Sequence, residues 1–139
     1  MPMKLHLNFA KMVVLISLGY LLGVAAGRDS SLEAALKLIK EGANVDAKDS
    51  IGRTALMHAA LDGDSETALK LIEGGAKIDE KDNDGMTALM CAAGGGHSEI
   101  ALKLIKEGAK INEKDNNGRT AWIYAAQGGH SKMLTIVGK

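Results

Sequence analysis

Apolar residues recur along this chain in short helical patterns that are separated by polar, glycine-containing turns. The tetrapeptide Leu-Lys-Leu-Ile occupies residues 36–39, 69–72 and 102–105, so each copy follows the previous one by 33 residues. A Lys-Asp pair follows every copy at the same distance. A fixed period between about 20 and 50 residues indicates a stack of similar supersecondary units, and such a stack presents an extended surface rather than a closed cleft.

The unit at residues 83–115 begins with a predicted turn and a short helix. Asn, Asp and Gly at 83–85 tolerate positive φ or bond their own backbone, as tight turns require. Thr87 offers its hydroxyl as the N-cap of a helix that we expect to run through Ala93. The three glycines at 94–96 are expected to end this helix.

A second helix is predicted to begin at Ser98 and to end before Gly108, which suits the C′ position. A buried stripe at helical spacing is predicted for its apolar residues, which are Ile100, Ala101, Leu102, Leu104 and Ile105. One unit of turn, helix, loop and helix buries too little apolar surface to fold alone, so neighbouring units must share their faces.

This periodicity divides the chain into a leading segment and a repeat domain. The leading segment is residues 1–27, and the repeat domain is residues 28–139. The domain is predicted to contain a partial repeat at 28–49, full repeats at 50–82 and 83–115, and a capping repeat at 116–139. End units of stacks are commonly atypical because one of their faces meets water.

The leading segment has the layout of a secretory signal peptide. Lys4 and Lys11 precede an uncharged run at 12–27 that ends in small residues, so cleavage is expected after Ala26 or Gly27. The run of 16 residues is short for a membrane span, which needs about 20. Export to a periplasmic or extracellular space is therefore favoured. The alternatives are a cytoplasmic protein that retains this segment as a packed helix, and an uncleaved membrane anchor.

Composition indicates one globular domain with an aliphatic core, since 46% of the 139 residues are hydrophobic, 24% are charged and only 3% are aromatic. The formal net charge is zero, but residues 28–139 hold 15 basic and all 17 acidic residues, a net charge of −2. Such a domain lacks the basic field that attracts nucleic acid, so no nucleic-acid partner is expected.

Two segments resemble ligand-binding motifs, but each lacks an essential residue. Glu80, Asp82, Asp84 and Gly85 alternate as in a calcium loop, but the twelfth position is Cys91 instead of the required glutamate. The glycines at 94–96 are not followed by the Gly-Lys-Ser/Thr of a phosphate loop. Turn formation and a break between helices explain both segments, so neither calcium nor a nucleotide is expected.

Metal and thiol chemistry are equally weakly indicated. A zinc site needs three or four converging ligands, whereas His97 and His130 stand one period apart. Cys91 is the single cysteine, and His58, at the equivalent position one repeat earlier, is expected to lie too far away for a hydrogen bond. We therefore expect no catalytic residues, metal, cofactor or small-molecule substrate. A metal-binding protein or an enzyme is the remote alternative.

Three stretches of the chain resemble ankyrin repeats. They read GRTALMHAALDGDSETALKLIEGGAKID, GMTALMCAAGGGHSEIALKLIKEGAKIN and GRTAWIYAAQGGHSKML, and the resemblance covers about 110 residues from Ser30 onward. It implies an all-α solenoid of helix-turn-helix pairs that are joined by β-hairpin-like turns. Alanine replaces the family's proline and Met or Ile replaces its histidine in each stretch, so we expect a stack less stable than a consensus one.

The resemblance also implies a noncatalytic function, namely binding of an as yet unidentified partner protein by a monomeric stack through its concave face. If the leading segment is retained, the alternative is an intracellular or membrane-tethered adaptor. Carried over position by position, the candidate contacts are Ser50, Ile51, Arg53, His58, Leu61, Asp62, Asn83, Asp84, Met86, Cys91, Gly94, Asn116, Asn117, Arg119, Tyr124 and Gln127. Trp122 matches the position of Leu56 and Leu89 and is expected in the core. Tyr124 is equally compatible with a contact and with a packing role.

Overall fold

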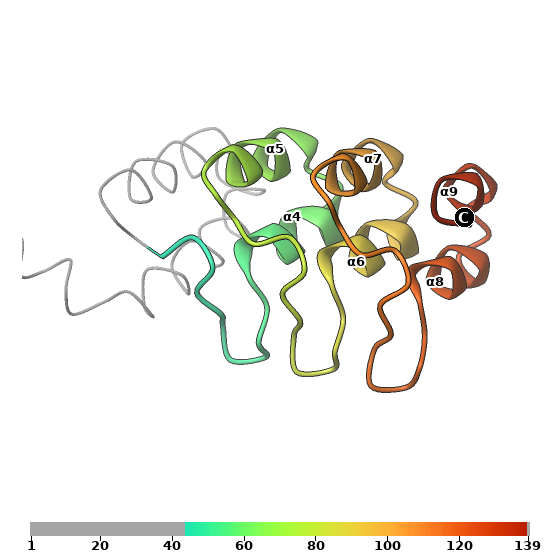
Figure 1. Cartoon of the computed structure of the whole chain (residues 1–139), viewed down its shortest axis with the longest axis horizontal. Coiled ribbons are helices and arrows are strands. Elements are labelled where there is room, and N and C mark those ends of the chain that lie inside the picture. Colours follow the sequence, from blue (N-terminus) through green and yellow to red (C-terminus); the bar gives the residue numbers. More distant parts are fainter. Residues whose placement is uncertain (1–43, 139) are drawn as a thin grey trace, which may run out of the picture.

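A computed structural model describes residues 44–138, and this range contains helices and turns but no β-strand. The helices are α4 (Ala55–Asp62), α5 (Ser65–Glu73), α6 (Ala88–Gly95), α7 (Ser98–Lys106), α8 (Ala121–Gln127) and α9 (Ser131–Val137) (Figure 1). The predicted all-α repeat solenoid is thereby confirmed. The leading segment and most of the partial repeat lie outside the described residues, and the predicted repeat boundaries stay a prediction.

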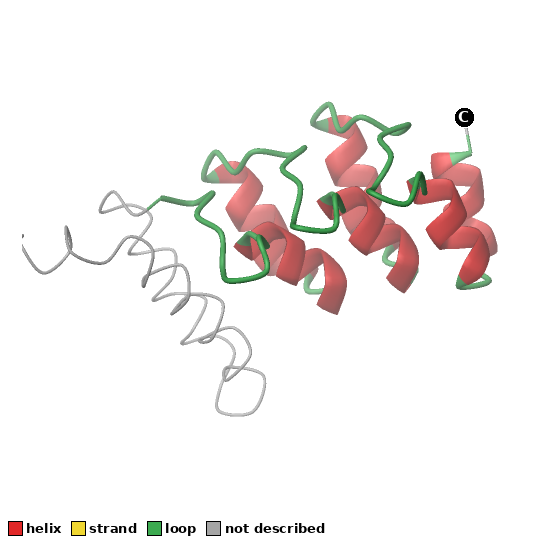
Figure 2. Cartoon of the chain, turned by 90° about the horizontal axis from the view of Figure 1, so that it is seen from below, coloured by secondary structure: helices red, strands yellow, loops and turns green. Residues whose placement is uncertain are grey.

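The helices form two rows that run along the stack (Figures 1 and 2). The first helix of each pair packs on the first helix of the next, as α4 does on α6 and α6 does on α8. The second helices α5, α7 and α9 form the other row in the same manner. The loops that join successive pairs extend beyond the first-helix row as hairpins (Figure 1). Each hairpin therefore lies beside the next one along the stack.

Threonine and glycine set the ends of the first helices. The hydroxyl of Thr87 accepts a hydrogen bond from the Met90 N–H at 3.3 Å, as predicted for an N-cap. Helix α6 then continues to Gly95, two residues beyond the predicted end, and stops at Gly96 with φ of 74°. Gly94 and Gly95 remain helical, and the third glycine ends the helix because it takes the left-handed conformation that glycine readily adopts.

Replacing the N-cap threonine of the middle repeat tests this account of the helix start. We expect Thr87→Ala to lower the free energy of unfolding by about 1 kcal/mol, because the Met90 N–H loses its buried acceptor. Thr120→Ala is the matched control, since Thr120 occupies the same position in α8 without a side-chain cap bond. Urea denaturation followed by circular dichroism measures both, and equal losses would contradict the capping role.

The core is aliphatic and repeats from one unit to the next. Leu56 and Leu89 of the first helices are 1% and 2% exposed, and Leu71 and Leu104 of the second helices are 1% and 0% exposed. Between the first helices lie alanines of near-zero exposure, which allow these helices to approach closely. They are Ala59, Ala60, Ala92 and Ala93.

The predicted buried stripe of α7 is wrong at Leu102, which is 52% exposed. Ile100, Ala101 and Leu104 share one face at spacings i, i+1 and i+4, and all three are buried. Leu102 lies two residues from both Ile100 and Leu104, and two residues correspond to about 200° around a helix. Its side chain therefore points away from the core and into solvent.

Candidate functional site

One aspartate shapes each of the three hairpins within residues 44–138. In the second hairpin, Oδ1 of Asp82 accepts hydrogen bonds from the N–H groups of Asp84 and Met86, both at 2.9 Å. The Asp82 N–H donates to the Met86 carbonyl at 3.0 Å, and the Gly85 N–H donates to the Asp82 carbonyl at 2.9 Å. Asp49 and Asp115 repeat all four bonds. The carboxylates thus satisfy backbone groups that a tight hairpin would otherwise leave unpaired.

The second carboxylate oxygen of each aspartate binds a side chain from a neighbouring element. Asp49 Oδ2 lies 2.8 Å from Nε2 of His58, and Asp115 Oδ2 accepts from the Tyr124 hydroxyl, so each hairpin is tied to the first helix that follows it. Cys91 stands at the equivalent position in α6 and cannot replace these donors. Arg53 of the preceding hairpin donates to Asp82 Oδ2 at 3.3 Å instead.

These bonds change the acidity of the two outer aspartates. Burial acts to raise the pKa of Asp49, but hydrogen bonds from the His58 ring and from the Arg53 and Ile51 N–H groups outweigh it, so the pKa lies below its ordinary value. Burial likewise acts to raise the pKa of Asp115, and the Tyr124 hydroxyl with two N–H groups lowers it further than burial raises it. Both aspartates are therefore held as carboxylates in the folded chain.

A pH dependence of stability follows from the lowered pKa values. A carboxyl group whose pKa is lower in the folded than in the unfolded chain stabilises the fold above its unfolded pKa, about 3.9, and this stabilisation is lost as pH falls through the folded pKa. We therefore expect the free energy of unfolding to fall as the solution is acidified from about pH 5.

The double variant Asp49→Asn, Asp115→Asn should lose part of this acid dependence, because the amide oxygen still accepts the hairpin bonds but does not titrate. Urea unfolding at a series of pH values compares the slopes of the two proteins. Identical slopes would contradict the assignment of the acid dependence to these carboxylates.

A ladder of polar contacts joins each hairpin to the next. Nζ of Lys48 donates to the Lys81 carbonyl at 2.7 Å and lies 3.1 Å from Glu80. Nζ of Lys81 repeats both contacts one period later, with the Lys114 carbonyl at 3.2 Å and Glu113 at 2.8 Å. Exposed ion pairs contribute little stability individually, so the ladder mainly fixes the register of successive hairpins.

Backbone bonds run alongside this ladder at the hairpin tips. The Asn83 N–H donates to the Ile51 carbonyl at 3.0 Å, and the Asn116 N–H donates to the Asp84 carbonyl at 2.9 Å. The sequence indicated that these residues are periodic but gave no sign that they bond across repeats. The bonds hold the tips as one continuous edge.

The two loop histidines bridge repeats rather than cap their own helices. Nε2 of His97 lies 3.2 Å from the Leu61 carbonyl, and Nε2 of His130 lies 3.0 Å from the Gly94 carbonyl, in each case one repeat earlier. Neither ring makes a cap bond to the helix that it precedes. The histidines therefore serve packing between repeats.

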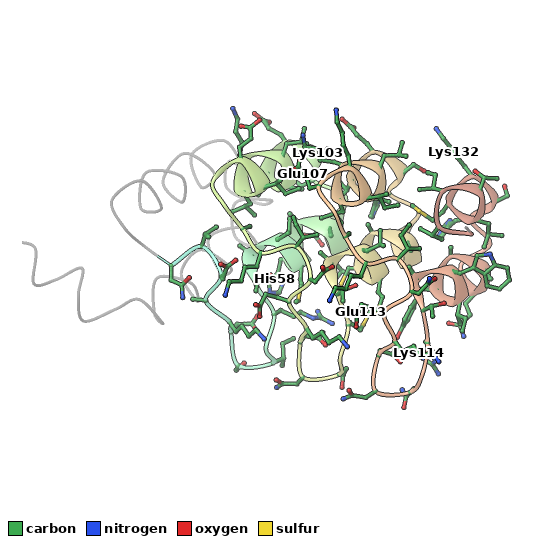
Figure 3. The ribbon with its side chains drawn as sticks, viewed as in Figure 1. His58, Lys103, Glu107, Glu113, Lys114 and Lys132 are labelled. Carbon is green, nitrogen blue, oxygen red and sulfur yellow. The ribbon has the colours of Figure 1, made fainter. Side chains whose placement is uncertain are left out.

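Most predicted contact residues lie at the hairpin tips and on the first helices. Ten are exposed, namely Ser50, Ile51, Leu61, Asp62, Asn83, Asp84, Asn116, Asn117, Arg119 and Gln127. Five are half-buried, namely Arg53, His58, Met86, Gly94 and Tyr124. His58 and Tyr124 are held by the hairpin aspartates (His58 is labelled in Figure 3), so both have a structural role whether or not they also contact a partner.

Cys91 cannot be a contact residue, because its side chain is 1% exposed. It belongs to α6, which is flanked by α4 on one side and α8 on the other. Burial raises the pKa of the thiol to about 11, so the sulfur stays protonated at neutral pH. Cys91 acts as a small core residue.

Trp122 was expected in the core, and this prediction is wrong because its side chain is 47% exposed. Leu56 and Leu89, its equivalents, are covered by the first helix of the following repeat. No further repeat follows α8 and α9 within residues 44–138, so the ring remains at the surface.

Comparison with known protein families gives a match over most of the chain. A family model described as ankyrin repeats, in three copies, matches residues 22–115 and 59–137. No curated protein matches the chain. Within residues 44–138, no group of three His, Cys, Asp or Glu side chains is placed to hold a metal ion. In that same part of the chain, no helix has the length and apolar character of a membrane span.

Proposed function

Because the chain belongs to the ankyrin repeat family, we propose that it binds another protein through the face formed by its hairpin tips and first helices, which we call the concave face. Ankyrin repeats suggest a protein–protein interaction module. The observation that carries the proposal is the pair of large apolar side chains on this face: Ile51 is 47% exposed and Leu61 is 41% exposed. Apolar residues in a rigid surface are the usual anchors of protein interfaces.

The hydrogen bonds and ion pairs that hold the hairpins support the same proposal. The aspartate bonds and the cross-repeat ladder, all made within the chain, fix the backbone of the hairpins that the structure describes. A surface that is ordered before binding loses less conformational entropy on association. Exposed tip residues such as Arg119 and Asn117 would then determine which partner is bound.

A triple substitution at the tips tests the face. Wild-type chain, immobilised at its C-terminus, captures partner proteins from an extract of the source organism, and the captured partner is then purified. We expect the variant Ile51→Ser, Met86→Ser, Arg119→Ser to bind that partner at least about tenfold more weakly, a loss of about 1.4 kcal/mol.

The matched control carries Lys70→Ser, Glu73→Ser and Lys106→Ser, three exposed positions at the C-terminal ends of the second helices. Circular dichroism melting verifies that both variants are folded. Equal affinity of the tip variant and the wild type, or a greater loss in the control, would assign binding to another face.

Export of the protein is part of the proposal and rests on the composition of residues 1–27. Mass spectrometry of the protein purified from its native source determines the N-terminal residue. A first residue of Gly27 or Arg28 is expected for the exported form. An intact Met1 would favour the alternative, an intracellular or membrane-tethered adaptor.

A further inference from the structure

The tip of the third hairpin carries the asparagine that is chemically most prone to change. Asn117 is followed by Gly118, and no other asparagine of the sequence precedes a glycine. Asparagine is a labile residue because the backbone nitrogen that follows it can attack the carbon of its side-chain amide. Glycine has no side chain to hinder that approach, so the reaction is easiest at an asparagine–glycine pair.

The position of Asn117 is exposed in all three described hairpins. Ile51 and Asp84 are its equivalents in the first and second hairpins, and both are exposed. Asp84 is exposed although another hairpin lies on either side of it, as the backbone bonds between the tips show (Figure 1). The exposure therefore belongs to the position within the hairpin, and solvent reaches the Asn117 side chain for the same reason.

Amide groups hold the neighbouring asparagines of the hairpins in place. Nδ2 of Asn116 donates to the Asn83 carbonyl at 3.0 Å, and Nδ2 of Asn83 donates to the Ser50 carbonyl at 3.4 Å. In the described part of the chain, the side chain of Asn117 has no hydrogen-bond partner. Its amide is therefore able to rotate toward the nitrogen of Gly118.

One backbone hydrogen bond opposes the reaction. The Gly118 N–H donates to the Asp115 carbonyl at 3.0 Å, and it must be released and lose its proton before the nitrogen can attack. Exposed turns open locally at much less than the free energy of global unfolding. We therefore expect the reaction to proceed through transient opening of this turn and to be faster at higher pH, because hydroxide removes the proton.

We propose that Asn117 is a site of spontaneous deamidation in the folded protein. The Gly118 nitrogen forms a bond to Cγ of Asn117, the bond between Cγ and Nδ2 breaks, and ammonia leaves a cyclic imide behind. One water molecule then opens the imide. Cleavage between the nitrogen and Cγ gives aspartate in an ordinary main chain. Cleavage between the nitrogen and the backbone carbonyl carbon gives isoaspartate, in which the main chain runs through the former side chain.

The two products have different effects on the hairpin. Aspartate is compatible with the turn, because Asp84 holds this position in the second hairpin and makes the same 2.9 Å backbone bond as Asn117. Isoaspartate adds a methylene to the main chain between the N–H groups of residues 117 and 118. Both groups bond to Asp115, so the lengthened chain cannot keep the two bonds together. Isoaspartate therefore opens the turn.

The same turn positions Arg119, a predicted contact residue. Its N–H donates to Asp115 Oδ1 at 2.8 Å, and its carbonyl accepts from the Asp115 N–H at 2.9 Å. Isoaspartate at position 117 therefore displaces Arg119 and alters the concave face. The modification itself does not rest on the proposed function, whereas this consequence for binding does.

Peptide mapping of the aged full chain tests the proposal. The purified chain is incubated at mildly alkaline pH, and trypsin, which cleaves after Lys114 and Arg119, then releases residues 115–119. A sample taken before incubation is digested in parallel to correct for deamidation during digestion. Asn116 lies in the same peptide and is the internal control.

We expect residue 117 to gain the mass that corresponds to exchange of NH₂ for OH, in two products that separate by chromatography. This change should be at least several-fold faster than any change at Asn116 or Asn83. Asn117→Gln is the matched control, since it keeps the amide but moves it one methylene further away, which disfavours ring closure. The peptide of this variant should keep its mass.

Urea unfolding distinguishes the two products. Freshly prepared Asn117→Asp represents the ordinary product and should unfold at the same urea concentration as the fresh wild type. The aged wild type should unfold at a lower concentration, in proportion to its isoaspartate content. Aged Asn117→Gln should show no such shift, which excludes other damage during incubation.

Three results would overturn the proposal. One is an unchanged residue 117 in the folded chain while a synthetic peptide of residues 115–119 deamidates, because the hairpin then prevents the attack. Another is earlier deamidation of Asn116 or Asn83. The third is isoaspartate at position 117 without any shift in urea unfolding.

Binding to the purified partner is measured separately. We expect the aged wild type to bind the partner several-fold more weakly than aged Asn117→Gln. Equal binding in the presence of isoaspartate would contradict the concave-face assignment of the proposed function and would leave the modification site established.

Discussion

Leu104→Ala is expected to lower the free energy of unfolding by about 2–5 kcal/mol, the range for removing a fully buried leucine from a packed core. Leu104 is 0% exposed and lies on the face of α7 that packs into the stack. The substitution removes apolar contacts and leaves a cavity that α6 and the helices beside it fill only in part. Because each repeat depends on its neighbours, the loss should appear in unfolding of the whole stack.

Leu102→Ala is the internal control, since both leucines belong to the same helix and the change in helix propensity is the same. Leu102 is 52% exposed, so its replacement should change the free energy of unfolding by no more than about 0.5 kcal/mol. Urea denaturation followed by circular dichroism measures both. Comparable losses in the two variants would show that α7 is rotated relative to the described packing.

Gly85→Ala is expected to cost roughly 2–4 kcal/mol, because it combines backbone strain with a collision between repeats. Gly85 has φ of 81°, and an added Cβ would lie 2.6 Å from Oδ1 and 2.9 Å from the backbone nitrogen of Asn116. The asparagine side chain can rotate away. Its backbone nitrogen is held by a 2.9 Å bond to the Asp84 carbonyl, so relief of the clash requires that bond to break.

Gly118→Ala separates the two contributions. Gly118 has φ of 78° in the third hairpin, but an added Cβ would have no atom within 4 Å. Gly118→Ala should therefore lower the free energy of unfolding only by the conformational strain of about 1–2 kcal/mol. Thermal and urea unfolding of the two variants measures the difference, and equal destabilisation would show that the hairpin tips do not contact one another as described.

The sequence predicted the architecture well because the stack is built from local signals that recur. Thr87 as an N-cap, the helix start at Ser98 and the glycine after the second helix each depend on residues adjacent in the chain, and all three are found where they were expected. The errors have a different origin. Trp122 shares a sequence position with buried leucines, but its exposure depends on whether another repeat lies beside it.

The polar framework of the candidate site could not be predicted in the same way. The periodic Lys-Asp pairs are visible in the sequence, but periodicity identifies equivalent residues and does not show which atoms face each other across repeats. Arg53, for example, binds Asp82 in the next hairpin, and Cys91 of the following helix offers that carboxylate no ring or hydroxyl donor. Asp82 is bound by an arginine where Asp49 and Asp115 are bound by His58 and Tyr124, and this difference depends on which side chains lie close in three dimensions.

Because Asp82 depends on Arg53 of the preceding hairpin, not every repeat of this chain can be duplicated in tandem with the same result. A second successive copy of the unit that contains Asp82 and Cys91 would be preceded by methionine at the position of Arg53, since Met86 is its equivalent. The side chain of Asp82 is 2% exposed in its present setting, and its duplicate would lack both the guanidinium of Arg53 and a ring donor. The order of units is therefore constrained, and insertion is better tolerated beside units that supply their own donor, as Tyr124 does for Asp115.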